Sequence, residues 1–296
     1  MKTEKRGKER KEVNEVKESE RNIAAFFDLD GTLMPLPSLE RRFFRILRYR
    51  GEIPARNYFL WLTEALRLLP RGISALWHAN KMYVRGVHIL DECGQEDRHV
   101  SSWHKGGHQV EGQASAPPRC NPRLPVLGFL AQGVERVAWH AKQGHKIVLV
   151  SGTLEPLAWE AACAIEGELA ARGIATEIRV CATRLEEKNG KWTGRILGEA
   201  MFGKVKAYVA KRLAEELQLD LKQCYAYGDS LYDRWLMDAV GKPAAVNPPM
   251  DLLSLARKRA WTVLHWDEKE HQSPWNRGLK VQRDCRMELP RLENAQ

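Results

Sequence analysis

An unbroken apolar run, Ile23–Phe27, is followed directly by two aspartates, Asp28 and Asp30. The run is short and bulky, which is typical of a strand buried on both faces of a parallel sheet. Two carboxylates one residue apart repel each other at the end of such a strand unless a cation lies between them. Because ligands of open α/β sheets bind at the carboxyl ends of the strands, we interpret the pair as part of a magnesium site. A simple Asx-type turn is the structural alternative.

A second predicted strand, Ile147–Val150, also ends in polar residues. Ser151, Gly152 and Thr153 follow it, and a helix begins shortly after them. A hydroxyl and exposed backbone N–H groups at such a position suit a phosphate. A plain Ser N-cap is the alternative, but the place after a buried strand favours the phosphate cradle.

Two later stretches add charges of both signs. The short predicted strand Tyr225–Tyr227 is followed by Asp229 and Asp233, and a predicted helix carries Lys204 and Lys206 near its start. Either lysine taken alone would be a solvated helix residue. Strands that alternate with helices predict an α/β fold whose parallel, right-handed sheet gathers these loops at one edge. Carboxylates, a lysine, a hydroxyl and backbone amides are the components that phosphoryl transfer to a carboxylate needs.

The stretch Asp28-Leu-Asp-Gly-Thr32 resembles the nucleophile motif of the haloacid dehalogenase superfamily, most of whose members are phosphatases. The other motifs follow in the order of that superfamily through roughly residues 23–250. The resemblance implies a Rossmann-like, doubly wound parallel sheet core. It also implies a helical cap domain between the first and second motifs, as in the phosphoserine-phosphatase-like branch.

By position, the resemblance makes Asp28 the nucleophile and Asp30 the general acid/base. It implies a Mg²⁺ cofactor held by Asp28, by the backbone carbonyl of Asp30 and by Asp229, with Thr32 in support.

The phosphoryl group would be bound by Ser151, by Gly152 and by a lysine. Lys206 matches the family pattern better, and Lys204 is the alternative. Asp233 would support the metal site and the lysine.

The implied function is a Mg²⁺-dependent phosphatase that hydrolyses a small phosphomonoester through an aspartyl-phosphate intermediate. A phosphotransferase of the same fold and a catalytically disabled binding or regulatory protein are the alternatives. A dehalogenase needs neither Asp229 nor an acid at position 30. Phosphoserine itself is disfavoured, because Pro37 stands where that branch places a substrate-binding glutamate and Tyr232 stands where it usually has an asparagine.

The predicted domain organisation has four parts. They are a disordered charged lead-in (1–22), an α/β hydrolase core (23–34 and 124–266), a helical cap (35–123) with an irregular segment (91–123), and a charged tail (267–296). In the cap, helical spacing extends from Leu39 through residue 69, and a second helical run covers 73–90. These helices carry many arginines, so the cap could contact a membrane surface, cover a core with a solvated face, or act as a lid.

Composition bears on the partners, the compartment and the metal content that we expect for this protein. The net charge of +9 favours anionic partners or substrates, but glutamates interleaved with the basic residues of the lead-in argue against a nucleic-acid arm. No apolar run reaches the roughly 18 residues of a transmembrane helix, and the charged N-terminus is unlike a signal peptide. Six scattered cysteines indicate reduced thiols and a cytoplasmic protein. His104 and His108, with Cys93 and Cys120 nearby, form only a weak zinc candidate, because Gly106-Gly107 separates the histidines.

Overall fold

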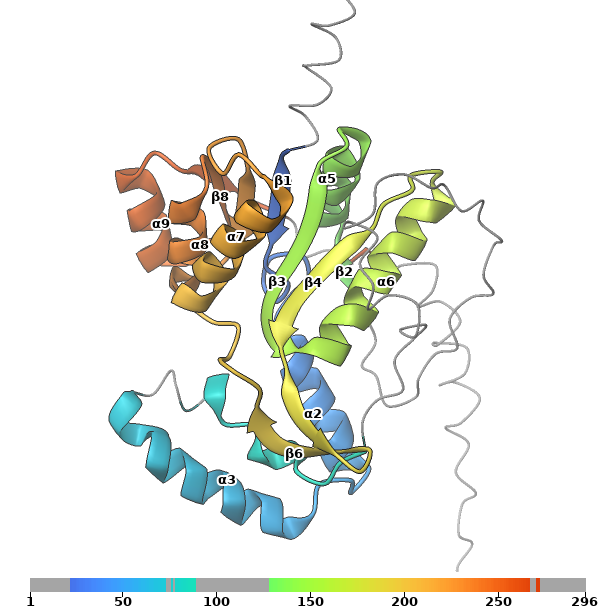
Figure 1. Ribbon diagram of the computed structural model, residues 1–296, viewed down its shortest axis with the longest axis vertical. Coiled ribbons are helices and arrows are strands. Elements are labelled where there is room, and N and C mark those ends of the chain that lie inside the picture. Colours follow the sequence, from blue (N-terminus) through green and yellow to red (C-terminus); the bar gives the residue numbers. More distant parts are fainter. Residues whose placement is uncertain (1–21, 73–75, 77, 89–127, 267–269, 272–296) are drawn as a thin grey trace, which may run out of the picture.

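The computed structural model describes residues 22–72, 76, 78–88, 128–266 and 270–271. A sheet with helices on both faces forms the larger part, and a smaller cap of helices and a hairpin lies beyond one edge of it (Figure 1). The sheet has six strands, all parallel, in the order β4 (Ile178–Thr183), β3 (Lys146–Leu154), β1 (Ala24–Phe27), β7 (Tyr225–Gly228), β8 (Lys242–Val246) and β9 (Thr262–Leu264). This confirms the predicted α/β class.

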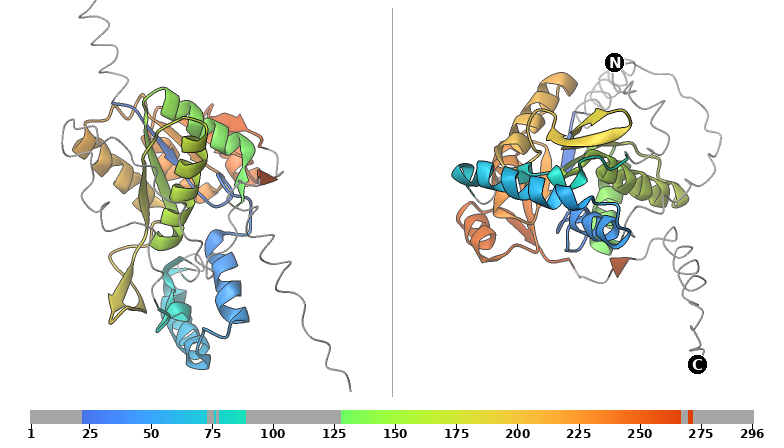
Figure 2. Two further views of the ribbon diagram at one scale, coloured as in Figure 1. Left: turned by 90° about the vertical axis from the view of Figure 1, so that its right-hand side faces the viewer. Right: turned by 90° about the horizontal axis from the view of Figure 1, so that it is seen from below.

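Helices cover both faces of the sheet (Figures 1 and 2). One face carries α5 (Ala131–Lys142) and α6 (Glu155–Ala171), and the other carries α7 (Lys204–Leu217), α8 (Arg234–Ala239) and α9 (Met250–Lys258). Successive residues of the central strand β1 are buried on opposite faces of the sheet, so both faces must pack against helices. Ala25 and Phe27 belong to the apolar cluster on the α5–α6 side, whereas Ala24 and Phe26 belong to the cluster on the α7–α9 side.

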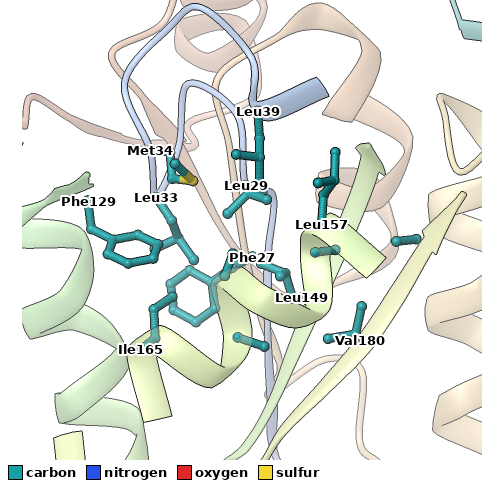
Figure 3. Close-up of a cluster of buried hydrophobic side chains, with 14 of the residues drawn as sticks. Phe27, Leu29, Leu33, Met34, Leu39, Phe129, Leu149, Leu157, Ile165 and Val180 are labelled. Carbon is teal, nitrogen blue, oxygen red and sulfur yellow. The ribbon is translucent and has the colours of Figure 1, made fainter. Parts of the chain in front are cut away.

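The larger cluster continues from the sheet toward the cap (Figure 3). Around Phe27 it gathers Leu29, Leu33, Leu149 and Ile165, all at most 2% exposed. Burial of a side chain of this size contributes about 1.5–3 kcal/mol. The loop that carries the two aspartates is therefore anchored by apolar side chains on either side of them.

The cap contains α2 (Leu39–Tyr49), α3 (Ala55–Leu68) and two short 3₁₀ helices, η1 (Leu69–Arg71) and η2 (Met82–Val84). A hairpin from the second half of the chain, β5 (Leu185–Lys188) and β6 (Lys191–Ile196), reaches down to it (Figure 1). Gly86 N donates to Trp192 O at 2.7 Å, and Trp192 N donates to Val87 O at 3.0 Å. The hairpin thus forms one unit with the cap.

Several predicted elements need correction. The helical block from Leu39 is two helices, since Gly51 has a φ of +67° and Pro54 is the N-cap of α3. The predicted helix over 73–90 is wrong for residues 80–88, where the chain forms η2 and then pairs with β6. Directly before α5, Phe129–Leu130 forms a short strand (β2) antiparallel to β10 (Glu270–His271).

Some predictions concern residues outside the described ones. They are the lead-in, the irregular segment with its histidine–cysteine zinc candidate, and most of the charged tail. Among the described residues, no helix combines the length and apolar character that crossing a membrane requires. Three cysteines in the described part, Cys163, Cys181 and Cys224, are free thiols.

Candidate active site

Three neighbouring strands bring their polar ends together. β1 pairs with β3 and with β7, with Phe27 opposite Leu149 and Tyr227. Asp28 follows directly and donates its backbone N–H to Tyr227 O at 2.9 Å. The carboxyl ends of the three strands therefore meet at one edge, as the alternation of strands and helices predicts.

Lys206 lies at the centre of this edge. Its ammonium Nζ donates to Asp28 Oδ1 and to Asp233 Oδ1, each at 2.6 Å, and its side chain is only 5% exposed. α7 projects Lys206 inward because its neighbours Val209 and Ala210 face the core. Lys204 lies on the exposed side of the same helix, and the structure does not bring it to the cluster.

The carboxylates around this lysine form a compact oxygen-rich group. Carboxylate oxygens of Asp28, Asp229 and Asp233 all lie within 4.8 Å of one another. Both carboxylate oxygens of Asp233 already accept hydrogen bonds. Its Oδ2 accepts from the N–H and the hydroxyl of Ser230, and its Oδ1 accepts from Lys206. Asp28 and Asp229 are left as the side chains suited to a hard divalent cation such as Mg²⁺.

Gly31 allows the carboxylate of Asp229 to approach the loop that carries Asp28 and Asp30. Its φ is +87°, and a Cβ added there would lie 2.1 Å from Asp229 Oδ2. Only a glycine leaves room for the carboxylate beside the loop. The space that a Cβ would fill is taken up by a carboxylate of the candidate metal site.

Burial and mutual repulsion control the charges of the site. Burial raises the pKa of Asp28 well above its usual range, with further upward contributions from Asp233 and Asp229, while Lys206 opposes them. Burial, and next Asp233, raise the pKa of Asp229 to about 7. Burial would lower the pKa of Lys206, but the carboxylates of Asp233 and Asp28 outweigh it and raise that pKa. The site holds more negative charge than one lysine neutralises, which is the electrostatic setting that a bound cation relieves.

Asp30 lies at the side of this cluster that faces the cap. Its Oδ1 accepts the backbone N–H of Leu39, the first residue of α2, at 2.6 Å. Burial raises the pKa of Asp30 to about 6, although the hydrogen bond from Leu39 opposes the shift. A carboxyl with such a pKa exchanges protons readily near neutral pH.

The predicted phosphate cradle is the last part of a strand. β3 continues through Leu154, and α6 begins at Glu155 as expected. Ser151 Oγ accepts the N–H of Thr153 at 3.2 Å, and Gly152 O accepts from Thr183 Oγ1 at 2.8 Å. These contacts fix the end of β3, while the Ser151 hydroxyl keeps its own proton to donate.

Two buried hydroxyls near these loops lack a partner. Thr32 Oγ1 and Thr153 Oγ1 take part in no hydrogen bond within the described part of the chain. Buried polar groups are normally paired, so unpaired hydroxyls beside a phosphate or metal site are consistent with a ligand or water that completes them.

Three aromatic side chains lie next to the site, and only Tyr232 among them is marked by its position in a motif. The ring of His78 stacks on Phe202 with centroids 3.4 Å apart, and Phe202 meets Tyr232 at 4.4 Å. A Cβ built on Gly152 would lie 4.0 Å from His78 Nδ1, so the histidine lies beside the predicted phosphate cradle at the end of β3. Burial, and next Lys81, lower the pKa of His78 to about 4, so the ring is neutral. The sequence around His78 and Phe202 is that of an ordinary helix or loop, and no local signal marks these two residues.

A buried polar group holds this part of the cap. Lys81, only 2% exposed, donates to both carboxylate oxygens of Glu40 at 2.6 Å, and the Tyr83 hydroxyl donates to Glu40 Oε1 at 2.8 Å. Glu40 lies in the first turn of α2, next to Leu39, whose backbone N–H donates to Asp30. This group connects the segment that carries His78 to the helix that contacts Asp30.

Comparison with known proteins identifies the class. Residues 25–238 match the family model of the haloacid dehalogenase-like hydrolases. A phosphoserine phosphatase of Mycobacterium tuberculosis is 34% identical over 252 residues, which span 81% of this chain and 70% of that protein. A probable phosphatase of the same organism is 32% identical over 241 residues, or 81% of this chain and 74% of that protein.

Among solved structures, a protein of unknown function from Bordetella pertussis is similar in fold. It is 23% identical, with a TM-score of 0.51 over 82% of this chain and 98% of that one.

Proposed function

The chain belongs to the haloacid dehalogenase-like hydrolases, and from that membership and its site we propose a Mg²⁺-dependent phosphatase that forms an aspartyl-phosphate on Asp28. The observation that carries the proposal is the buried ammonium of Lys206 between Asp28 and Asp233 at the end of β1. A nucleophilic carboxylate repels a dianionic phosphate, and positive charge beside it lowers that barrier.

In the first step, an oxygen of Asp28 attacks phosphorus and the bond from phosphorus to the ester oxygen breaks. The leaving alkoxide takes its proton from the carboxyl of Asp30. The hydrogen bond from Leu39 N holds that carboxyl in place for the transfer. The proton and the electron pair of the broken bond thus both end on the alcohol product.

In the second step, Asp30, now a carboxylate, takes a proton from water. The water oxygen attacks the phosphorus of the aspartyl-phosphate, which releases inorganic phosphate and restores the Asp28 carboxylate. One residue serves as acid and then as base, and its pKa of about 6 suits both roles.

The phosphoryl oxygens meet three donors, one from α7 and two from the end of β3. Lys206 supplies a charge, Ser151 a hydroxyl, and Gly152 a backbone N–H at the end of β3. Thr183 holds the Gly152 carbonyl by a 2.8 Å hydrogen bond. Donors fixed in advance stabilise the developing charge without reorganisation.

Mg²⁺ would be held by the carboxylates of Asp28 and Asp229 and by the carbonyl of Asp30. The oxygen donors fit the cation, and Asp233 is committed to Lys206 and Ser230 instead. When bound, the cation neutralises phosphate charge near the nucleophile.

The alcohol part of the substrate faces the rim made by His78, Phe202 and Tyr232. This rim is aromatic and uncharged, and Pro37 provides no carboxylate for an amine. Phosphoserine, the substrate in the name of one relative, is therefore a compound to test rather than the expected preference.

The test is phosphate release by the full-length protein from a panel of monoesters. The panel contains phosphoserine, p-nitrophenyl phosphate, sugar phosphates and nucleoside monophosphates, each with Mg²⁺ and with EDTA. We expect at least one ester to be hydrolysed with Mg²⁺, the rate to vanish with EDTA, and added Mg²⁺ to restore it. Folded protein that hydrolyses none of them, or that is equally active in EDTA, would overturn the proposal. Transfer of phosphate to added alcohols instead of water would identify a phosphotransferase.

A further inference from the structure

The outer helix of the cap exposes an unusual amount of apolar surface. Five large side chains are 45–68% exposed, namely Tyr58, Phe59, Leu62, Leu66 and Leu69. Four of them follow the spacing i, i+3, i+7, i+10 from position 59, so they lie on one face of the helical run. The opposite face is buried through Asn57, Ala65 and Leu68. We call the five exposed residues the α3 stripe. An apolar patch this contiguous usually has a partner.

Positive charge lies beside the α3 stripe. Arg56 and Arg67, at i and i+11, form a ridge on the adjacent exposed side of α3, where Arg67 also pairs with Glu64 at 3.6 Å and stays 79% exposed. Arg56 also lines an open hollow of about 350 Å³ together with Arg85, Lys188 and Lys191. None of the described residues that line this hollow is acidic, and these four cations form no ion pair within the described chain. The positive surface therefore continues from the helix to the tip of the β5–β6 hairpin.

We propose that α3 lies in the plane of an anionic phospholipid surface. The α3 stripe enters the boundary between headgroups and acyl chains, and the cations of the ridge and hollow contact the lipid phosphates. An apolar face flanked by arginine and lysine is the arrangement that binds helices in this way.

The position of α3 permits this contact. It forms the layer of the cap farthest from the sheet, and it lies in front of the sheet when the molecule is seen from below (Figures 1 and 2). The active-site edge lies on the opposite side of the cap, so a bilayer against α3 leaves the sheet free.

A second copy of the chain suits this surface less well. A symmetric contact through α3 would bring the same face of both copies together, arginine ridges included. Each copy carries a net charge of +9, so two copies in contact would repel each other. An anionic bilayer would instead attract the same positive surface.

The experiment is co-sedimentation of the full-length protein with vesicles of phosphatidylcholine alone or mixed with phosphatidylglycerol, in 0.1 M salt. We expect at least tenfold tighter binding to the anionic vesicles. The double variant Leu62→Glu/Leu66→Glu should lose at least tenfold of that binding. Lys188→Ala/Lys191→Ala should weaken it by about tenfold and reduce its salt dependence.

A matched control introduces the same charges elsewhere. Tyr208 and Met250 are 64% and 74% exposed on α7 and α9, so Tyr208→Glu/Met250→Glu should bind like the wild type. Near-UV circular dichroism checks that each variant is folded. If Leu62→Glu/Leu66→Glu does not fold, Leu62→Ser/Leu66→Ser is measured in its place.

Three outcomes would overturn the proposal. They are no binding of wild-type protein to anionic vesicles, equal loss in the control and stripe variants, and a dimer in light scattering that the stripe variant abolishes. The last outcome would assign the stripe to contact between copies of the chain. All these readouts are independent of phosphatase activity.

Discussion

The ammonium of Lys206 lies 2.6 Å from the carboxylate of Asp28, although 178 positions separate the two residues in the chain. The same ammonium is 2.6 Å from Asp233, and all three side chains are at most 8% exposed. Removal of this ammonium takes away the positive charge that the two buried carboxylates share.

Lys206→Met should therefore destabilise the fold as well as abolish turnover. We expect a loss of about 3–5 kcal/mol in the free energy of unfolding, measured by urea denaturation without metal. Lys204→Met, on the exposed side of the same helix, should change it by less than about 0.5 kcal/mol. Equal effects of the two substitutions would show that Lys206 does not hold the charge balance of the site.

Gly31→Ala should impair the enzyme by displacing Asp229. The added Cβ would lie 2.1 Å from Asp229 Oδ2 at a φ of +87°. Gly144→Ala is a matched control, since Gly144 has a φ of +74° but nothing within 4 Å. Both variants should lose about 1–3 kcal/mol through backbone strain, but only Gly31→Ala should need more Mg²⁺ for half-maximal activity. An unchanged Mg²⁺ requirement in Gly31→Ala would argue against Asp229 as a ligand.

Asp30→Asn should slow the hydrolysis of alkyl phosphates by about 10²–10⁴-fold, because the leaving alkoxide then lacks its proton donor. The loss should be much smaller for p-nitrophenyl phosphate, whose leaving group departs without a proton. The comparison of kcat on the two substrates tests this directly. Equal losses on both would contradict the acid role of Asp30.

Acid should destabilise the fold through His140. This buried imidazole contacts the Tyr227 hydroxyl at 2.9 Å and His145 Nδ1 at 2.8 Å. Burial, and next His145, lower its pKa to about 3, whereas the unfolded chain takes up the proton near the usual value of about 6.5. The unfolded state therefore binds more protons as the pH falls below 6.5.

Between pH 7.5 and pH 5, this difference should cost the wild type about 2 kcal/mol of unfolding free energy. Because other groups titrate in the same range, the measurement is the difference in pH dependence between wild type and His140→Gln. The variant should be less stable at pH 7.5 and should lack this part of the pH dependence. Identical pH profiles would show that His140 is not the group responsible.

Much of the core could be predicted because its signals are local. The run Ile23–Phe27 contains the buried strand β1, because apolar side chains lie on both of its faces. Asn189 and Gly190, a pair typical of tight hairpin turns, form the turn between β5 and β6 with φ angles of +53° and +69°. Motif order then placed Asp28, Ser151 and Asp229 at one edge, because parallel strands leave little choice of arrangement.

The cap could not be predicted as well, because its structure depends on long-range contacts. Residues 80–88 have apolar spacing that fits a helix, yet Asn80 and Lys81 are buried in polar contacts and Val87 pairs with Trp192. The choice between the lysines of α7 differs, because the family pattern favours Lys206 and the structure brings Lys206 to the cluster. The stacking of His78 on Phe202 is decided by packing between distant segments.

The most direct test of the central claim is phosphate release by wild type and Asp28→Asn under identical conditions with saturating Mg²⁺. The two side chains have nearly the same shape, so circular dichroism should show the same fold. We predict that the wild type hydrolyses at least one monoester and that the variant releases no phosphate above background, because the amide cannot form the aspartyl-phosphate. Turnover by folded Asp28→Asn at a rate near that of the wild type would contradict the covalent mechanism.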